Sequence, residues 1–502
     1  MVRVLTVAGL LACLASGCAS GGSSVGKEAA ADEIKKGGFT VAASCHDPQI
    51  IREGDTYYMF GSHMVGAKCQ DLRKWNYFAN GVDAANTLFD NLLTEPYAAF
   101  DFVGKNTDNG YSVWASNVIY NETMKKYVMY FCTTSSYVKS TLCFATADNI
   151  EGPYTYVDTI LYSGYGKSNI SETNLYDVLG KNADISRYLE YGGYNNKEWP
   201  NCIDPAIFTD ADGRMWMNYG SWSGGIFLLE IDPTTGYPIY PVDDKDADPY
   251  YGYRLIGGGH HSAEGPYIQY DAENGYYYLF VSYGDLQSDG GYQIRQFRSE
   301  KPTGPYVDVA GNTLEDQDDH FNYGLKMMGN YTFLSLNYTY MAPGGQSTFQ
   351  DDDGKYYITY HQRFDDGTEY HEPRVHQMYT NEDGWFVAAP FATMGETLSE
   401  KGYKKSDVSG TFYVVNHGTD ISSKIREAEA YTFADGKVTG GEKSGTYEVR
   451  EGTDYITITL DGVVYKGVLM EMTDEAENPV FCFSAAGDNE ETLWGVQYIQ
   501  KE

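Results

Sequence analysis

"DPAIFTDADGRMWMNYGS", residues 204–221, contains a short apolar run, an acidic turn with a glycine, and then an aromatic and apolar run. This order is typical of a β-hairpin, because turn residues separate two segments that favour extended structure. Hairpins of the same kind recur at 47–63, 116–131, 265–284 and 347–361, and helical periodicity is nearly absent. The recurrence predicts an all-β fold, a five-bladed β-propeller of four-stranded blades. A two-sheet sandwich is the alternative, but it does not explain a hairpin that keeps returning.

The propeller pattern is expected over residues 40–395. After it, "SGTYEVREGTDYITITLDGVVYKGVLMEM" (444–472) alternates polar and apolar residues with tight turns and no blade hairpin. Residues 396–502 are therefore predicted to form a separate small β-barrel or sandwich. Two roles stay open for this domain: it binds carbohydrate, or it packs against the propeller.

The first residues indicate export. "MVRVLTVAGLLACLASGC" (1–18) has one arginine, an apolar run and small residues before Cys18, as in a secretory signal. The small residues resemble a bacterial lipobox, which implies a lipidated Cys18 and anchoring at the cell surface or periplasmic face; a plain signal peptide is the alternative. Residues 19–39 are expected to be a flexible tether. No other stretch approaches the roughly 18 apolar residues of a membrane span.

Six cysteines follow the signal, and none of them forms a CxxC pair. This spacing argues against a zinc or redox site. Export permits disulfides, and Cys132 and Cys143 are spaced to face each other across a hairpin.

The charge balance restricts the partners. The chain has 70 acidic against 36 basic residues, a net charge of −34. Such a surface repels nucleic acid and polyanions, including acidic pectin, but tolerates neutral ligands. The 47 tyrosines suit both strand surfaces and sugar rings. We expect a monomer whose partner is a neutral polysaccharide, with no nucleic acid and no membrane contact except the lipid anchor.

Three of the five hairpins begin at or next to a carboxylate: Asp47 in "CHDPQI", Asp204 in "CIDPAIF" and Glu264 in "SAEGPYI". The innermost strands of a propeller line one axis, so residues at equivalent entrances converge on one pocket. Converging carboxylates in a dry pocket have different pKa values, and glycoside hydrolysis needs one ionised and one protonated carboxyl. An Asp before Pro is also a common turn starter, but three equivalent copies favour catalysis.

The tetrapeptide Glu-Gly-Pro-Tyr occurs twice, at Glu264 and at Glu151. Glu151 follows an outer strand, and the equivalent turn of another blade has Thr303 before Gly-Pro-Tyr. The outer turn therefore does not need the glutamate. We expect Glu151 to be structural and Glu264 to be functional.

The two Asp-Pro entrances and the second Glu-Gly-Pro-Tyr resemble glycoside hydrolase family 43, over about 40–395. The stretches "WPNCIDPAIFTDADGRMWMNYGSWSGGIF", "GPYIQYDAENGYYYLFVSYGDLQSDGGYQIR" and "YHQRFDDGTEYHEPRVHQMYTNEDGW" resemble its two-domain endo-α-1,5-L-arabinanases most. The resemblance implies a five-bladed propeller and hydrolysis with inversion. It also implies Asp47 as general base, Glu264 as general acid, and Asp204 as the residue that tunes and orients the acid.

Four further residues lie at or beside blade entrances, where a furanose ring would stack or accept hydrogen bonds: His46, Trp114, Asn117 and Trp222. Packing within the propeller is the alternative for the two tryptophans. Asn117 departs from the family's Trp-Ala-x-Asp, which leaves a polar contact without the charge.

The resemblance also implies a calcium ion in the central channel, held by His361 of "YYITYHQRF" with water as the main other ligand. A satisfied structural histidine is the alternative. Gly345 stands where relatives often carry an axial histidine, so a substrate or metal contact there is in doubt.

The same fold serves exo-arabinanases, α-L-arabinofuranosidases and β-xylosidases, and the long segment 167–201 would favour exo action if it closed one end of the groove. A surface sugar-binding lipoprotein without catalysis is the alternative from another class, but it would not need all three carboxylates.

Overall fold

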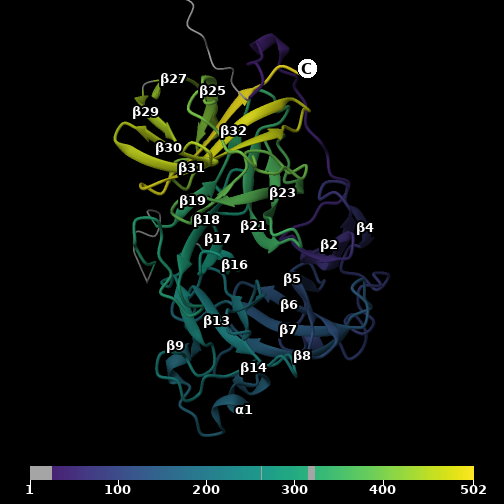
Figure 1. Cartoon of the computed structure of the whole chain (residues 1–502). Helices are drawn as coiled ribbons and strands as arrows, with labels where there is room; N and C mark the ends of the chain where they lie inside the picture. The colour runs from purple at the N-terminus through teal and green to yellow at the C-terminus, as the bar shows by residue number, and fades with distance from the viewer. Residues whose placement is uncertain (1–24, 262, 315–322, 442, 502) are drawn as a thin grey trace, which may run out of the picture.

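The computed structural model describes residues 25–261, 263–314, 323–441 and 443–501 (Figure 1). Within these residues it confirms the all-β fold and the five blades. The predicted signal and Cys18 lie outside the described residues. No helix in the described ranges has the length and apolar character that crossing a membrane requires.

Each predicted hairpin forms the inner two strands of one sheet. Blade one has β1 (Gln49–Glu53), β2 (Thr56–Gly61), β3 (Val65–Cys69) and β4 (Asn76–Ala79). Blade two has β5 (Ser112–Asn121), β6 (Lys126–Ser136), β7 (Lys139–Ala147) and β8 (Thr155–Tyr162). Blade three has β11 (Ala206–Thr209), β12 (Met215–Tyr219), β13 (Ile226–Ile231), β14 (Pro238–Ile239) and β15 (Tyr253–Ile256).

Blade four has β16 (Glu264–Asp271), β17 (Tyr276–Tyr283), β18 (Gln293–Ser299) and β19 (Leu325–Met328). Blade five has β21 (Tyr340–Gln350), β22 (Tyr356–Phe364), β23 (His371–Thr380) and β24 (Phe386–Ala388), extended by β20 (Tyr331–Thr332) and β26 (Arg426–Glu427). The innermost strands β1, β5, β11, β16 and β21 contact one another in a closed ring. This ring brings the five entrances together around one axis.

The segment between blades two and three carries the one α-helix of the described residues, α1 (Leu175–Leu179), and a short hairpin of β9 (Leu189–Glu190) and β10 (Gly193–Tyr194). Short 3₁₀ turns lie at Ala31–Glu33, Ser62–Met64, Ala98–Phe100, Ile170–Glu172 and Ser186–Tyr188. Tyr188 and Trp199 of this segment are buried against Tyr251, which follows β14. The segment is therefore packed onto blade three.

The C-terminal domain is a barrel rather than a sandwich. Its strands are β25 (Gly410–Asn416), β27 (Glu429–Ala434), β28 (Lys437–Gly440), β29 (Lys443–Val449), β30 (Tyr455–Leu460), β31 (Val463–Thr473), β32 (Pro479–Gly487) and β33 (Thr492–Tyr498). Pairing of β25 with β33 closes the ring of eight strands. The aromatic residues Phe412, Phe433, Phe481 and Phe483 fill its interior, so inward-facing side chains leave a packed core.

The described part of the expected tether, residues 25–39, does not run free. Val25 is buried in the core of the barrel. The N–H of Ala29 donates to the carbonyl of Tyr498 at 2.8 Å, and the N–H of Gly37 donates to the carbonyl of Ser335 at 2.9 Å. In Figure 1 this purple segment passes from the barrel toward blade one. The prediction of a flexible tether is therefore wrong for residues 25–39.

The suggested pairing of Cys132 with Cys143 is also wrong. Cys143 lies opposite Phe131 in the register of β6 and β7, and Cys132 lies opposite Leu142. Neighbouring residues of a strand point to opposite faces of the sheet, so the two thiols face away from each other. All six cysteines in the described residues are buried and free.

Candidate active site

A hollow of about 700 Å³ opens at one end of the propeller axis; we call it the cleft. Glu264, Trp114 and Trp222 line it, together with the loop 284–287 of blade four. Asn201 is the one residue of segment 167–201 in its lining.

Glu264 is the first residue of β16 and is held by three donors. The Tyr292 hydroxyl donates to Oε1 at 2.7 Å, and the Ser221 hydroxyl and Trp222 indole donate to Oε2 at 2.9 and 3.0 Å. Burial raises the pKa of Glu264, aided by the charge of Asp47, although the hydrogen bonds from Tyr292 and Ser221 oppose the rise. A positioned carboxyl with a raised pKa is suited to donate a proton.

The entrance of blade four differs from the sequence-based alignment by one residue. Asp47 and Asp204 both adopt left-handed φ values, 54° and 56°, and the matching left-handed residue of blade four is Gly265, with φ 57°. The β16–β17 register is Glu264 to Ser282 and then Tyr267 to Phe280, which inserts one extra residue at this point. Such a bulge redirects a side chain, and Glu264 thereby lines the cleft.

Asp47 lies at the entrance of blade one. Its Oδ2 bonds Nδ1 of His46 at 2.8 Å and accepts a hydrogen bond from the Ser62 hydroxyl at 2.6 Å. Burial alone would raise the pKa of Asp47, but His46 and the two hydrogen bonds hold it below its usual range. Asp47 is therefore the carboxyl that stays ionised.

Asp204 lies at the matching entrance of blade three, and its Oδ2 accepts the N–H of Gly265 at 3.1 Å. Burial, together with the charges of Asp47 and Glu264, raises the pKa of Asp204 well above its usual range. This carboxyl fixes the backbone directly beside Glu264. The geometry thus links all three predicted carboxylates electrostatically.

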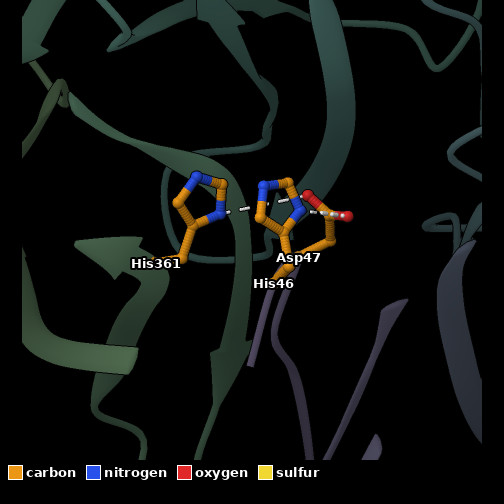
Figure 2. A group of neighbouring side chains, drawn as sticks. All are labelled: His46, Asp47 and His361. Atoms are coloured by element: carbon orange, nitrogen blue, oxygen red, sulfur yellow. Dashed lines mark hydrogen bonds and ion pairs between the residues drawn. The ribbon is translucent and has the colours of Figure 1, made fainter. Parts of the chain in front are cut away.

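The imidazoles of His46 and His361 both lie beside the Asp47 carboxylate. Figure 2 shows the two imidazoles with the Asp47 carboxylate, which both rings approach, and the ring centroids lie 4.0 Å apart in a stacked arrangement. Nδ1 of His361 is 4.0 Å from Oδ1 of Asp47. His46 is thus a partner of the carboxylate, and it is absent from the cleft lining, where sequence reasoning expected a substrate contact.

His361 is the one predicted metal ligand, and its surroundings fit a cation. The side chain is fully buried, and neither ring nitrogen has a hydrogen-bond partner among the described residues. Burial, followed by the charge of His46, holds the pKa of His361 well below its usual range, so the ring is a neutral potential ligand. Ligand atoms of His46, Asp47 and His361 all lie within 4.8 Å of one another.

The other predicted contacts divide into two groups. Trp114 and Trp222 line the cleft, as a substrate contact requires. Asn117 is buried in the narrow channel beneath it, and its Oδ1 accepts the N–H of Ile207 in the next blade at 3.2 Å. Its side chain joins two blades in the channel that Asp47 and Asp204 also line, and the expected substrate contact of Asn117 stays a prediction.

Three residues that hold the carboxylates were not identified from the sequence: Ser62, Ser221 and Tyr292. The two serines did leave a signal, because "FGS" (60–62) and "YGS" (219–221) end the second strand of both Asp-Pro blades. Tyr292 left none, since it is one of 47 tyrosines.

Comparison with known proteins identifies the family. A model described as glycosyl hydrolases family 43 matches residues 170–386, and one described as a C-terminal lipocalin-like domain matches residues 390–495. The extracellular endo-α-(1→5)-L-arabinanase 2 of Bacillus subtilis is 38% identical over 467 residues, which cover 90% of this chain and 92% of that protein. The chain belongs to glycoside hydrolase family 43.

A second relative matches along most of its length. The extracellular endo-α-(1→5)-L-arabinanase of Thermotoga petrophila is 36% identical over 91% of this chain and 94% of that protein. A crystal structure of the endo-1,5-α-L-arabinanase from this organism superposes with a TM-score of 0.79, at 35% identity, over 91% of this chain and 98% of that one. The likeness therefore includes both the propeller and the barrel.

Proposed function

We propose that this family 43 hydrolase is an endo-acting arabinanase that cleaves α-1,5-linked L-arabinan with inversion of configuration. The observation that carries the proposal is that three buried carboxyls at the blade entrances have different partners: Asp47 bonds His46 and Ser62, Asp204 accepts the N–H of Gly265, and Glu264 accepts from Tyr292, Ser221 and Trp222. The directions of their pKa shifts agree with a division of roles, lowered for Asp47 and raised for Asp204 and Glu264. The substrate follows from the relatives named endo-arabinanases, which align with about nine-tenths of the chain.

Each carboxyl has a separate role in this proposal. Asp47 is the general base that takes a proton from water, because His46 and Ser62 keep it ionised. Glu264 is the general acid that protonates the departing sugar oxygen. Asp204 orients the acid through the N–H of Gly265. Trp114 and Trp222 offer faces for furanose rings in the cleft.

The test is hydrolysis of debranched arabinan, with product lengths followed by chromatography and the anomeric configuration by NMR at early times. We expect mixed arabino-oligosaccharides whose new reducing ends have the inverted configuration. Arabinose alone would instead mean exo action. Retained configuration, or activity restricted to aryl β-xylosides, would overturn the proposal.

We also propose a calcium ion in the channel beside His361. The unpartnered, neutral imidazole and its proximity to the Asp47 carboxylate support this site. Calcium prefers six to eight oxygen ligands, so His361 would be a single nitrogen ligand among waters. When bound, such a cation would favour the ionised form of Asp47.

Chelation tests the ion. Wild-type protein stripped with chelator should lose activity and regain it with calcium, and isothermal titration should show one site that His361→Ala removes. Full activity after stripping, with no calcium binding in the titration, would return His361 to a purely structural role.

We further infer that the protein is exported and anchored through a lipid on Cys18. The support is the lipobox-like sequence before Cys18 and the word extracellular in the names of the relatives. Labelled palmitate should be incorporated by the wild type and not by Cys18→Ala. Equal incorporation by both proteins, or none by the wild type, would contradict the anchor.

A further inference from the structure

The barrel contacts the propeller at the start of β18 in blade four. After β25, residues 417–426 cross to blade four and then form β26, which pairs in parallel with β20. The backbone of Ser422 lies so close to Gly291 that a Cβ on this glycine would be 2.8 Å from the Ser422 nitrogen. The carbonyl of Asp420 accepts a hydrogen bond from Nε2 of Gln293 at 3.1 Å. The barrel therefore supports the start of β18.

Gln293 bridges the two domains with its amide. The same Nε2 donates to the carbonyl of Gly291 at 3.1 Å, and Oε1 accepts from Nε and Nη2 of Arg295 at 3.3 and 3.2 Å. The side chain is 1% exposed, so water does not readily replace these bonds. The amide thus fixes the residues on both sides of Tyr292 relative to the barrel.

Tyr292 lies just beyond the end of the ladder. The last β17–β18 pair is Tyr283 with Gln293, so no ladder bond of this pair of strands holds Tyr292 itself. Its ring packs against Gly344, where a Cβ would be only 2.0 Å away, and stacks on His361 with centroids 5.7 Å apart. Its hydroxyl donates to Oε1 of Glu264 at 2.7 Å. Its position therefore depends on neighbours, of which Gln293 is adjacent in sequence.

We propose that Gln293 is a positioning residue for catalysis: it ties barrel residues 417–426 to the segment 291–293 and so holds the Tyr292 hydroxyl against Glu264. This inference rests on the proposed role of Glu264 as general acid. It gives the barrel a part in catalysis that does not require the barrel to bind sugar.

The chemical consequence is specific to proton donation. The Tyr292 hydrogen bond stabilises the carboxylate that remains after Glu264 has given up its proton, and a misplaced donor weakens this effect. The titratable groups that interact with Glu264 are Asp47, Asp204, His46, Tyr137 and Tyr292, and of these only Tyr292 is displaced in a Gln293→Met variant. Loss of the Tyr292 bond should therefore raise the pKa of Glu264 and move the alkaline limb of the rate profile to higher pH.

The experiment compares Gln293→Met with Tyr292→Phe, which removes the hydroxyl itself, in the full-length protein. On arabinan we expect kcat of Gln293→Met to fall between about tenfold and a hundredfold, the effect of a small misplacement of catalytic groups. KM should change little. With an aryl arabinofuranoside whose leaving group needs no proton, kcat should stay near wild type. The alkaline limb should move in the same direction in both variants.

The matched control is Lys466→Ala, which removes another contact between the barrel and the propeller, the ion pair of Lys466 with Asp383 at 2.6 Å. This variant should leave kcat on both substrates and the pH profile unchanged. If Gln293→Met fails to fold, Gln293→Asn replaces it, because this side chain stays neutral but is one methylene shorter than the reach to the Asp420 carbonyl. Equal losses on the two substrates, or no loss at all, would overturn the positioning role. Full arabinan activity of Glu264→Gln would instead overturn the proposed function.

Discussion

Glu264 and Glu151 stand in the same tetrapeptide but in different surroundings. Glu264 lines the cleft and accepts hydrogen bonds from Tyr292, Ser221 and Trp222. Glu151 pairs with Lys68 at 2.6 Å in a half-exposed ion pair on the outer edge of the blades. Only the position in the blade repeat distinguishes the two copies, and this position could be read from the sequence.

Substitution of these two glutamates should therefore have unequal effects. Glu264→Gln removes the proton donor, so kcat on arabinan should fall by about two to four orders of magnitude. Glu151→Gln loses a surface ion pair worth at most about 1 kcal/mol and should keep normal kinetics. Initial rates and melting temperatures of both variants check this. Equal loss of activity would mean that the blade assignment is mistaken.

The partners of the carboxylates were less accessible to sequence reasoning. Asp47 and Asp204 were found because Asp-Pro marks a blade entrance. Tyr292 follows a loop of blade four and meets Glu264 only after the strands pair. Hydrogen bonds between blades depend on side-chain direction, which a hairpin pattern does not specify.

The blade entrance is the recurring element of this fold. A left-handed residue occupies each entrance: Asp47, Ala115, Asp204, Gly265 and Gly345, with φ between 47° and 57°. Aspartate and glycine adopt this conformation more easily than other residues. The sequence predicted the five hairpins, but not the bulges that interrupt three of the innermost strands, because one inserted residue leaves the alternation on either side intact.

The entrance of blade five leaves no room for a side chain at Gly345. A Cβ at this glycine would lie 2.4 Å from Oδ1 of Asp47 and 2.8 Å from Nδ1 of His361. A histidine at this position, as expected in relatives, therefore has no room while Asp47 keeps its place. The observed position of Asp47 therefore requires a glycine at residue 345.

Gly345→Ala should displace Asp47 and lower kcat on arabinan by about tenfold or more. Gly354→Ala is the matched control, since Gly354 is also left-handed, with φ 83°, and has nothing within 4 Å of a Cβ. Both variants should lose roughly 1–2 kcal/mol of stability to backbone strain. Kinetics and denaturant melts separate the two effects. Normal kcat in Gly345→Ala would show that the base tolerates the added methyl group.

At the scale of the whole molecule, the two domains meet through buried polar groups. Lys326 of β19 donates to the carbonyl of Asp420 in the barrel at 2.8 Å, and burial lowers the pKa of Lys326 to about 7. The sequence predicted a second β domain but not this interface, because charged residues outside regular patterns carry no signal for burial. The alternation of β30 and β31 predicted the strands, and only closure by β33 shows the barrel.

Glu490 at this interface should make stability depend on pH. Its Oε1 accepts a 3.4 Å hydrogen bond from Asn312, which also contacts Asp308 of the propeller. Burial, together with Asp308, raises the pKa of Glu490 to about 8 from an ordinary value of 4.5. Below the ordinary pKa, Glu490 is protonated in both the folded and the unfolded state, so its ionisation does not lower the free energy of unfolding. As the pH rises toward 8, only the unfolded state loses the proton, so folding becomes less favourable.

Glu490→Gln removes this titration and keeps the shape of the side chain. The variant should melt near the wild-type temperature at about pH 5 and above it at about pH 8, with the difference growing between them. Glu477→Gln, on an exposed turn of the same barrel, should follow the wild type throughout. Thermal melts across this range decide the matter. A Glu490→Gln difference that stays constant with pH would mean that Glu490 ionises at its ordinary pKa, and that the two domains meet without a buried proton between Asp308 and Glu490.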